Sequence, residues 1–212
     1  MIFSRGRQSG RHAAKAAEQA TETVEVEVPP VGPYDISDAP AGVERLDLGS
    51  LQIPAVPGIE VRVQANPDGA IQQVVLVSGD SALQLGVFAA PRTEGIWDEV
   101  RAEIRESLRA DGAVVDETQG EYGGELVAQA KSADGGVTRL RFVGVDGPRW
   151  MIRAVYQGPA AVEPDQGEAL TECLHGLVVD RGSEARPVRE PLSLRLPKDA
   201  TPAADAATDA GA

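Results

Sequence analysis

Short runs in which apolar and polar residues alternate constrain the fold of this sequence more than any other feature. In the segment 59–65, IEVRVQA, the apolar residues Ile59, Val61 and Val63 alternate with charged or polar ones. A period of two places the two sets on opposite faces of a strand. The turn sequence Asn66-Pro67-Asp68-Gly69 then leads into the next apolar run, AIQQVVLVS. The pattern predicts a sheet built from hairpins.

Further runs of this kind predict the rest of the sheet. A turn at residues 78–80 leads to SALQLGVFAA, a third strand that completes an antiparallel meander. The other predicted strands are residues 113–118, 125–132 and 137–145, the run that begins at Trp150, and a closing strand or extended arm in EPLSLRLP, residues 190–197.

Two segments have the period of a helix instead. Residues 93–110, TEGIWDEVRAEIRESLRA, place four large apolar residues on one side: Trp97, Val100, Ile104 and Leu108. Thr93 is the predicted N-cap, and Gly112 lies where a left-handed residue ends a helix. A second helix is predicted to begin near Pro164 and to bury Leu170, Cys173, Leu174 and Leu177.

The order of these elements predicts an α+β fold: an antiparallel sheet of about six or seven strands with two helices packed on it, in the order βββ-α-ββββ-α-β. This order is similar to that of the Mog1/PsbP-like fold. By composition, residues 1–45 are a disordered basic-then-acidic arm with a Pro/Gly linker. Residues 46–196 form a single α+β domain, and residues 197–212 are a disordered Ala/Asp tail.

Charge and composition disfavour several classes of function. The formal net charge of −13 disfavours nucleic-acid binding, which needs a surplus of Lys and Arg on some face. One cysteine excludes an intramolecular disulfide, and two histidines leave little for a metal site, so we expect no metal and no cofactor. The chain has no run of 18 apolar residues and no apolar segment after its basic start, so we expect a cytoplasmic protein without a membrane span.

A combination of motifs resembles a known family. The motifs are GPYD at 32–35, RLDLGSLQIP at 45–54, GDSALQLGVFAAPR at 79–92, GIWDEVR at 95–101, GVDGPRWMIRAVYQGPAA at 144–161 and REPLSLRLP at 189–197. Together they resemble the uncharacterised actinobacterial family named domain of unknown function 3710, over about residues 30–197. The resemblance implies an actinobacterial cytosolic origin and brings no established activity.

The run after Gly144 contains the candidate contact residues for a partner or ligand. Arg149 and Arg153 flank Trp150, and Tyr156 follows, a set that suits an anionic ligand or a cation–π contact. On a strand, however, the two arginines share the face opposite Trp150, which favours a structural role for the tryptophan.

Ser81 and His175 are the only candidates for catalysis. Gly79-Asp80-Ser81 resembles the start of serine hydrolases with a Gly-Asp-Ser-Leu block, with Ala82 in place of the leucine, and Glu172-x-x-His175 is the nearest match to the partner motif. A serine at the end of a hairpin turn explains the same residues. Cys173 lies on the apolar stripe of its helix, where an inert buried thiol is expected.

An acidic alternating segment, ETVEVEV at 22–28, suits either a solvated linker or an edge strand added to a partner or to the chain's own sheet. Two functions remain open. The first is a non-enzymatic interaction or scaffold module for an unknown protein partner, with no nucleic acid and an unknown oligomeric state. The second is a small serine hydrolase that uses Ser81 with His175.

Overall fold

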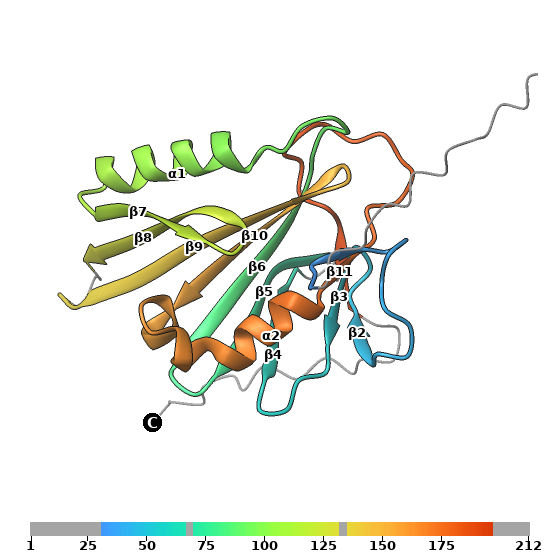
Figure 1. Ribbon diagram of the computed structural model, residues 1–212, viewed down its shortest axis with the longest axis horizontal. Helices are drawn as coiled ribbons and strands as arrows, with labels where there is room; N and C mark the ends of the chain where they lie inside the picture. The colour runs from blue at the N-terminus through green and yellow to red at the C-terminus, as the bar shows by residue number, and fades with distance from the viewer. Residues whose placement is uncertain (1–30, 67–69, 132–134, 197–212) are drawn as a thin grey trace, which may run out of the picture.

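The computed structural model describes residues 31–66, 70–131 and 135–196 (Figure 1). The predicted tail, most of the predicted arm with its segment 22–28, and the tips of two predicted turns lie outside the described residues. Inside the segment predicted as arm, Tyr34–Asp35 already form strand β1. Regular structure therefore begins before residue 46.

The larger of two sheets has eight strands. These are β4 (Glu60–Ala65), β5 (Ala70–Ser78), β6 (Ser81–Ala89), β7 (Val114–Gly120), β8 (Gly123–Lys131), β9 (Val137–Gly147), β10 (Trp150–Gln157) and β12 (Leu194–Arg195). Their order is β12-β5-β6-β10-β9-β8-β7, with β4 also paired to β5, and every pairing is antiparallel. Together with the helices, these strands confirm the predicted α+β class and the order βββ-α-ββββ-α-β of the main sheet.

A second sheet of four short strands was not predicted. It consists of β1, β2 (Arg45–Asp47), β3 (Leu51–Pro54) and β11 (Val178–Val179), in the order β1-β11-β3-β2. Strands of two to four residues are too short for a period of two to be recognised. The C-terminal segment joins the two sheets, because Leu194 pairs with Ile71 of β5 and forms a bridge with Gly49 beside β3.

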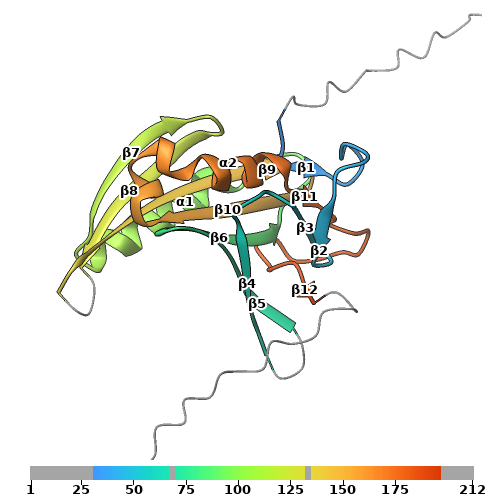
Figure 2. The same cartoon turned by 90° about the horizontal axis from the view of Figure 1, so that it is seen from below.

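The two helices lie on opposite faces of the large sheet (Figure 2). Helix α1 (Trp97–Ala110) covers β7, β8 and β9, with Met151 of β10 beneath its first turn. Helix α2 (Glu168–Gly176) follows the 3₁₀ turns η1 (Gly158–Ala161) and η2 (Pro164–Gly167) and packs with the small sheet on the other face. The main core lies on this second face.

Helix α1 begins four residues later than predicted. Its N-cap is Ile96, which has no side-chain oxygen, and Thr93 lies outside the helix. The cap comes instead from Asp146 of β9, whose carboxylate accepts hydrogen bonds from the N–H groups of Ile96 and Trp97. The predicted C-terminal signal is confirmed, because Gly112 has a φ of 82° and its N–H bonds the carbonyl of Arg109.

Candidate functional site

Two of the four predicted contact residues lie in the core. Trp150 and Tyr156 are each 1% exposed, on the face of β10 that packs against α2 and the small sheet. The indole Nε1 of Trp150 donates a hydrogen bond to Oδ2 of Asp35 at 3.0 Å, which fastens β1 to the large sheet. The hydroxyl of Tyr156 is 3.1 Å from that of Thr171 in α2. Neither side chain is accessible to a partner.

Arg149 lies in a turn and not on a strand. It forms the two-residue loop Pro148-Arg149 between β9 and β10, where its φ is 64°. Its guanidinium donates to the carbonyl oxygen of Gly182 at 3.0 Å. The alternation argument that placed it on one face with Arg153 therefore does not apply.

Arg153, like Arg149, is half-buried and remains at the surface. It lies on β10 opposite Gly86 of β6, and its guanidinium carbon is 5.3 Å from the centre of the Phe88 ring. Within the described residues its buried Nε has no hydrogen-bond partner. Burial lowers the pKa of its guanidinium. A half-buried cation without a carboxylate is costly, so this arginine favours an anionic group from outside.

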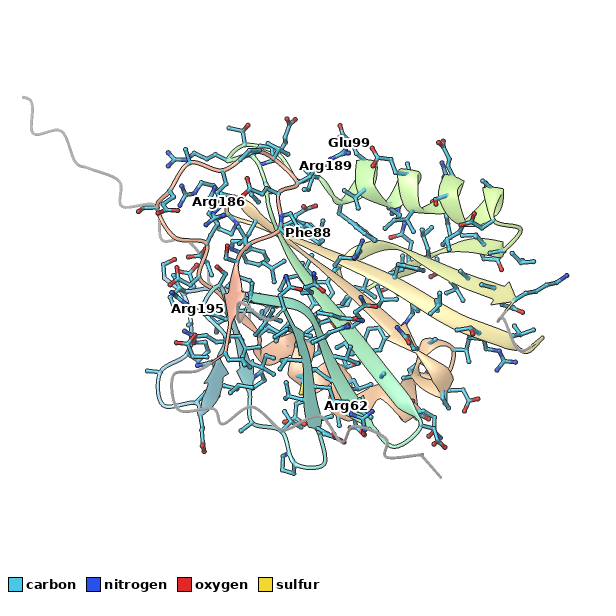
Figure 3. All side chains as sticks on the ribbon, turned by 180° about the vertical axis from the view of Figure 1, so that it is seen from behind. Arg62, Phe88, Glu99, Arg186, Arg189 and Arg195 are labelled. Carbon is cyan, nitrogen blue, oxygen red and sulfur yellow. The ribbon has the colours of Figure 1, made fainter. Side chains whose placement is uncertain are left out.

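The surface around Arg153 is a part of the large sheet that α1 leaves bare. The register brings together side chains from four strands on this face, which we call the open sheet face: Glu60, Arg62 and Gln64 of β4, Gln73, Val75 and Val77 of β5, Ala82, Gln84 and Gly86 of β6, and Arg153 and Gln157 of β10. All are half-buried or exposed. Figure 3 views the molecule from this side, with β4, β5 and β6 uncovered by a helix.

The open sheet face is hollowed and mixed in polarity. A hollow of about 400 Å³ lies over β4, β5 and the start of β6, lined among others by Arg62, Gln73, Val75 and Val77. Glu60 on this face is paired with Arg62 at 2.9 Å, and Asp80 also lines the hollow. In the described part of the chain, Arg153 is the cation of this face for which no ion pair is found.

A buried polar cluster lies on the opposite face of the sheet, and the sequence did not predict it. Glu125 of β8 is 6% exposed, and its carboxylate is 3.6 Å from the guanidinium of Arg141 on β9. Arg141 lies over the ring of Tyr156, 4.2 Å from its centre. The alternation in ELVAQAKS places Glu125 on the face opposite Leu126 and Ala128. In the sequence, one signal suggested that the face carrying Glu125 is also covered by other parts of the protein: β10 has apolar residues on both of its faces.

The surroundings of this cluster change its proton affinities. Burial raises the pKa of the Glu125 carboxyl, an effect that Arg141 opposes and Glu121 reinforces. Burial likewise raises the pKa of Tyr122, whose hydroxyl donates to the carbonyl of Gly32. Hollows of about 100 Å³ and about 290 Å³ adjoin Glu125 and Arg141, and the larger is also lined by Ala160 and Ala161 of η1.

Ser81 and His175 have separate partners. The Ser81 side chain is buried, and its Oγ accepts a hydrogen bond from the N–H of Ala160 at 3.1 Å. His175 lies near the end of α2, where its Nε2 is 2.8 Å from Oε2 of Glu121. The hydroxyl is thus engaged with the η1 turn and the imidazole with the β7–β8 turn. Activation of the serine needs a hydrogen bond between the two, and the described hydrogen bonds do not include one.

Other site chemistries have little support in the residues that the structure describes. No group of three His, Cys, Asp or Glu residues there is arranged to hold a metal ion. Burial raises the pKa of the Cys173 thiol to about 11, so it is a poor nucleophile at neutral pH. The search for membrane-spanning helices, made over the same residues, found none.

The fold and these sites define an α+β protein with two unequal sheets, an open sheet face on one side and a buried polar cluster on the other. Residues 32–203 match the family described as protein of unknown function (DUF3710), and the chain belongs to this family. The resemblance predicted from the motifs is therefore confirmed. No curated protein matches the sequence.

Proposed function

We propose that this protein is a non-enzymatic interaction module, and that its open sheet face binds an acidic segment of a protein partner. The observation that carries the proposal is Arg153, a half-buried arginine on this face whose guanidinium has no ion pair or hydrogen bond among the described residues. An incoming carboxylate would pair with its guanidinium, and Arg–carboxylate pairs are among the stronger hydrogen-bonded contacts.

The rest of the open sheet face suits a polypeptide. Val75 and Val77 offer apolar contacts inside the hollow, and four glutamines around them, Gln64, Gln73, Gln84 and Gln157, carry both donors and acceptors. Amide side chains of this kind match the N–H and C=O groups of an extended chain. The cation of Arg153 favours a partner segment that carries a carboxylate.

A site-specific photo-crosslinking experiment tests this proposal. A benzophenone amino acid replaces Gln73 on the open sheet face in one variant and Val114, an exposed residue of β7, in the control. The variants are expressed in the organism that supplies the gene. We expect a defined protein to be crosslinked from position 73 and not from position 114.

Reversal of the charge at Arg153 then shows whether the crosslinked protein binds specifically to the open sheet face. Arg153→Glu should abolish the crosslink from position 73, whereas Arg139→Glu, at an exposed arginine outside this face, should preserve it. Thermal melting confirms that both variants are folded. The proposal fails if the two positions capture the same proteins, if the reversal at Arg153 has no effect, or if only another copy of this chain is crosslinked.

A further inference from the structure

A second hollow lies apart from the open sheet face, where the turn between β2 and β3 meets the segment after β11. Its volume is about 340 Å³. Three arginines line it, Arg181, Arg186 and Arg195, together with two carboxylates, Asp180 and Glu184, two serines, Ser50 and Ser193, and two glycines. Figure 3 shows Arg186 and Arg195 on the same edge of the molecule.

Arg181 is the most deeply placed of the three arginines. It is 8% exposed, and its Nη1 donates to the carbonyl oxygen of Glu184. Its Nε is buried without a hydrogen-bond partner in the described part of the chain. A buried guanidinium with an unused N–H is costly to maintain, because burial of a polar group loses its bonds to water.

Arg195 lines the hollow beside Gly49. Gly49 has a φ of 85°, and a side chain added there would approach the Arg195 Nε to 3.2 Å. Glycine at this position therefore lets the arginine lie against the turn. Within the described residues, no hydrogen bond or ion pair from the Arg195 guanidinium is found.

The carboxylates at the hollow have partners within the protein. Asp180 Oδ1 accepts a hydrogen bond from the N–H of Gly182 at 3.0 Å. Glu184 lies 3.5 Å from Arg186, and Glu190 lies 3.2 Å from the same guanidinium. These contacts balance Arg186, whereas the guanidinium of Arg195 and the Nη2 of Arg181 have no hydrogen bond among the described residues.

We propose that this hollow binds a small oxyanion, a phosphate group held between Arg181 and Arg195 with the hydroxyls of Ser50 and Ser193. Guanidinium groups match the oxygens of phosphate in pairs, and serine hydroxyls donate to the remaining oxygens. The group has two sources, free inorganic phosphate or the phosphate of a small metabolite, and the volume of the hollow accommodates either.

Nuclear magnetic resonance of the full chain tests the site directly. Inorganic phosphate is titrated at constant ionic strength while the backbone amide of Gly182 and the arginine Nε–H signals are followed. We expect saturable shifts at Gly182 and at the Nε–H of Arg181. A parallel titration with ribose 5-phosphate identifies the source: tighter binding than inorganic phosphate indicates a metabolite, and equal binding indicates the free ion.

Two exposed arginines provide the matched variants. Arg195→Gln should weaken phosphate binding by about tenfold or more, because it removes a charged donor. Arg139→Gln, at an exposed arginine of β9 that lines neither hollow, should leave the affinity unchanged. The proposal is overturned by shifts that do not saturate, by equal weakening in both variants, or by no weakening in Arg195→Gln. Since the crosslinking experiment tests the open sheet face, failure here leaves the proposed function unaffected.

Discussion

Asp146 and Trp97 are joined by a hydrogen bond that fixes the start of α1 on the large sheet. Oδ2 of the Asp146 carboxylate accepts from the backbone N–H of Trp97 at 3.2 Å, while Oδ1 accepts from that of Ile96 at 2.9 Å. The carboxylate also lies at the positive end of the helix dipole. A strand distant in sequence thus supplies the cap that a local serine or threonine usually provides.

Replacement of this cap should destabilise the protein measurably. Asp146→Ala is expected to lower the free energy of unfolding by about 1–2 kcal/mol, because two N–H groups lose their acceptor. Thr93→Ala, at the N-cap predicted from the sequence, should change it by less than about 0.5 kcal/mol. Urea denaturation measures both variants. Equal losses in the two would show that Asp146 does not cap the helix.

Gly144 leaves the space in which the indole of Trp97 lies. An added Cβ at Gly144 would overlap the Trp97 ring, whose Nε1 also donates to the carbonyl of Gly124 at 2.7 Å. Gly144→Ala should therefore cost about 1–3 kcal/mol through displacement of α1. In the double variant with Trp97→Ala the two losses should be less than additive, because the clash is gone. Strict additivity in denaturation experiments would contradict this contact.

Glu125 should make stability depend on pH in a definite direction. Its pKa is raised above the ordinary value of 4.5, mainly by burial, so the folded protein binds this proton more tightly than the unfolded chain. The stabilisation from the carboxyl is complete below its unfolded pKa and is lost as pH rises through the folded pKa. Glu125→Gln mimics the neutral form at every pH.

The melting temperature of Glu125→Gln relative to wild type should therefore increase between about pH 4 and about pH 8. Glu106→Gln, at an exposed position on α1, serves as the comparison for the removal of one carboxylate. The prediction is contradicted if the melting-temperature difference between Glu125→Gln and wild type stays constant or decreases as pH rises. Either result would mean that the pairing with Arg141 affects the Glu125 pKa more than burial does.

Cys173 should be unreactive in the folded protein. Its thiol is fully buried in α2, and its pKa of about 11 leaves little thiolate at neutral pH. A disulfide reagent at neutral pH is expected to modify it only at the rate of unfolding. Modification in guanidinium chloride provides the control for the reagent. Fast modification of the native protein would contradict the burial of this residue.

The sequence predicted the large sheet well because its strands are long enough for alternation to be visible. It also predicted Gly112 and the burial of Leu170, Cys173 and Leu174. It missed the small sheet, whose strands have four residues or fewer, and it placed the cap of α1 on Thr93. Local pattern cannot reveal a partner such as Asp146 that only tertiary structure brings near.

The candidate site was harder to predict for a related reason. Alternation correctly predicted that Trp150 and Arg153 lie on opposite faces of the strand. Which of the two side chains is buried depends on where α1 and α2 pack on the sheet, and alternation does not show this. Arg149 lies in the turn and not in the strand, because the hairpin has a positive φ at this position. The cluster of Glu125, Arg141 and Tyr156 forms across three strands, and its register becomes visible only in the folded chain.

The parallel pairing of β1 with β11 has a consequence for how the chain folds. Tyr34 lies beside Val178, and β11 in turn pairs with β3, so the small sheet has its central strand from the far end of the sequence. During synthesis β2 and β3 can pair with each other early, but β1 and β3 lack the strand between them until β11 has emerged. Contacts so distant in sequence are slow to form. We therefore expect the small sheet to be the last part of the molecule to close.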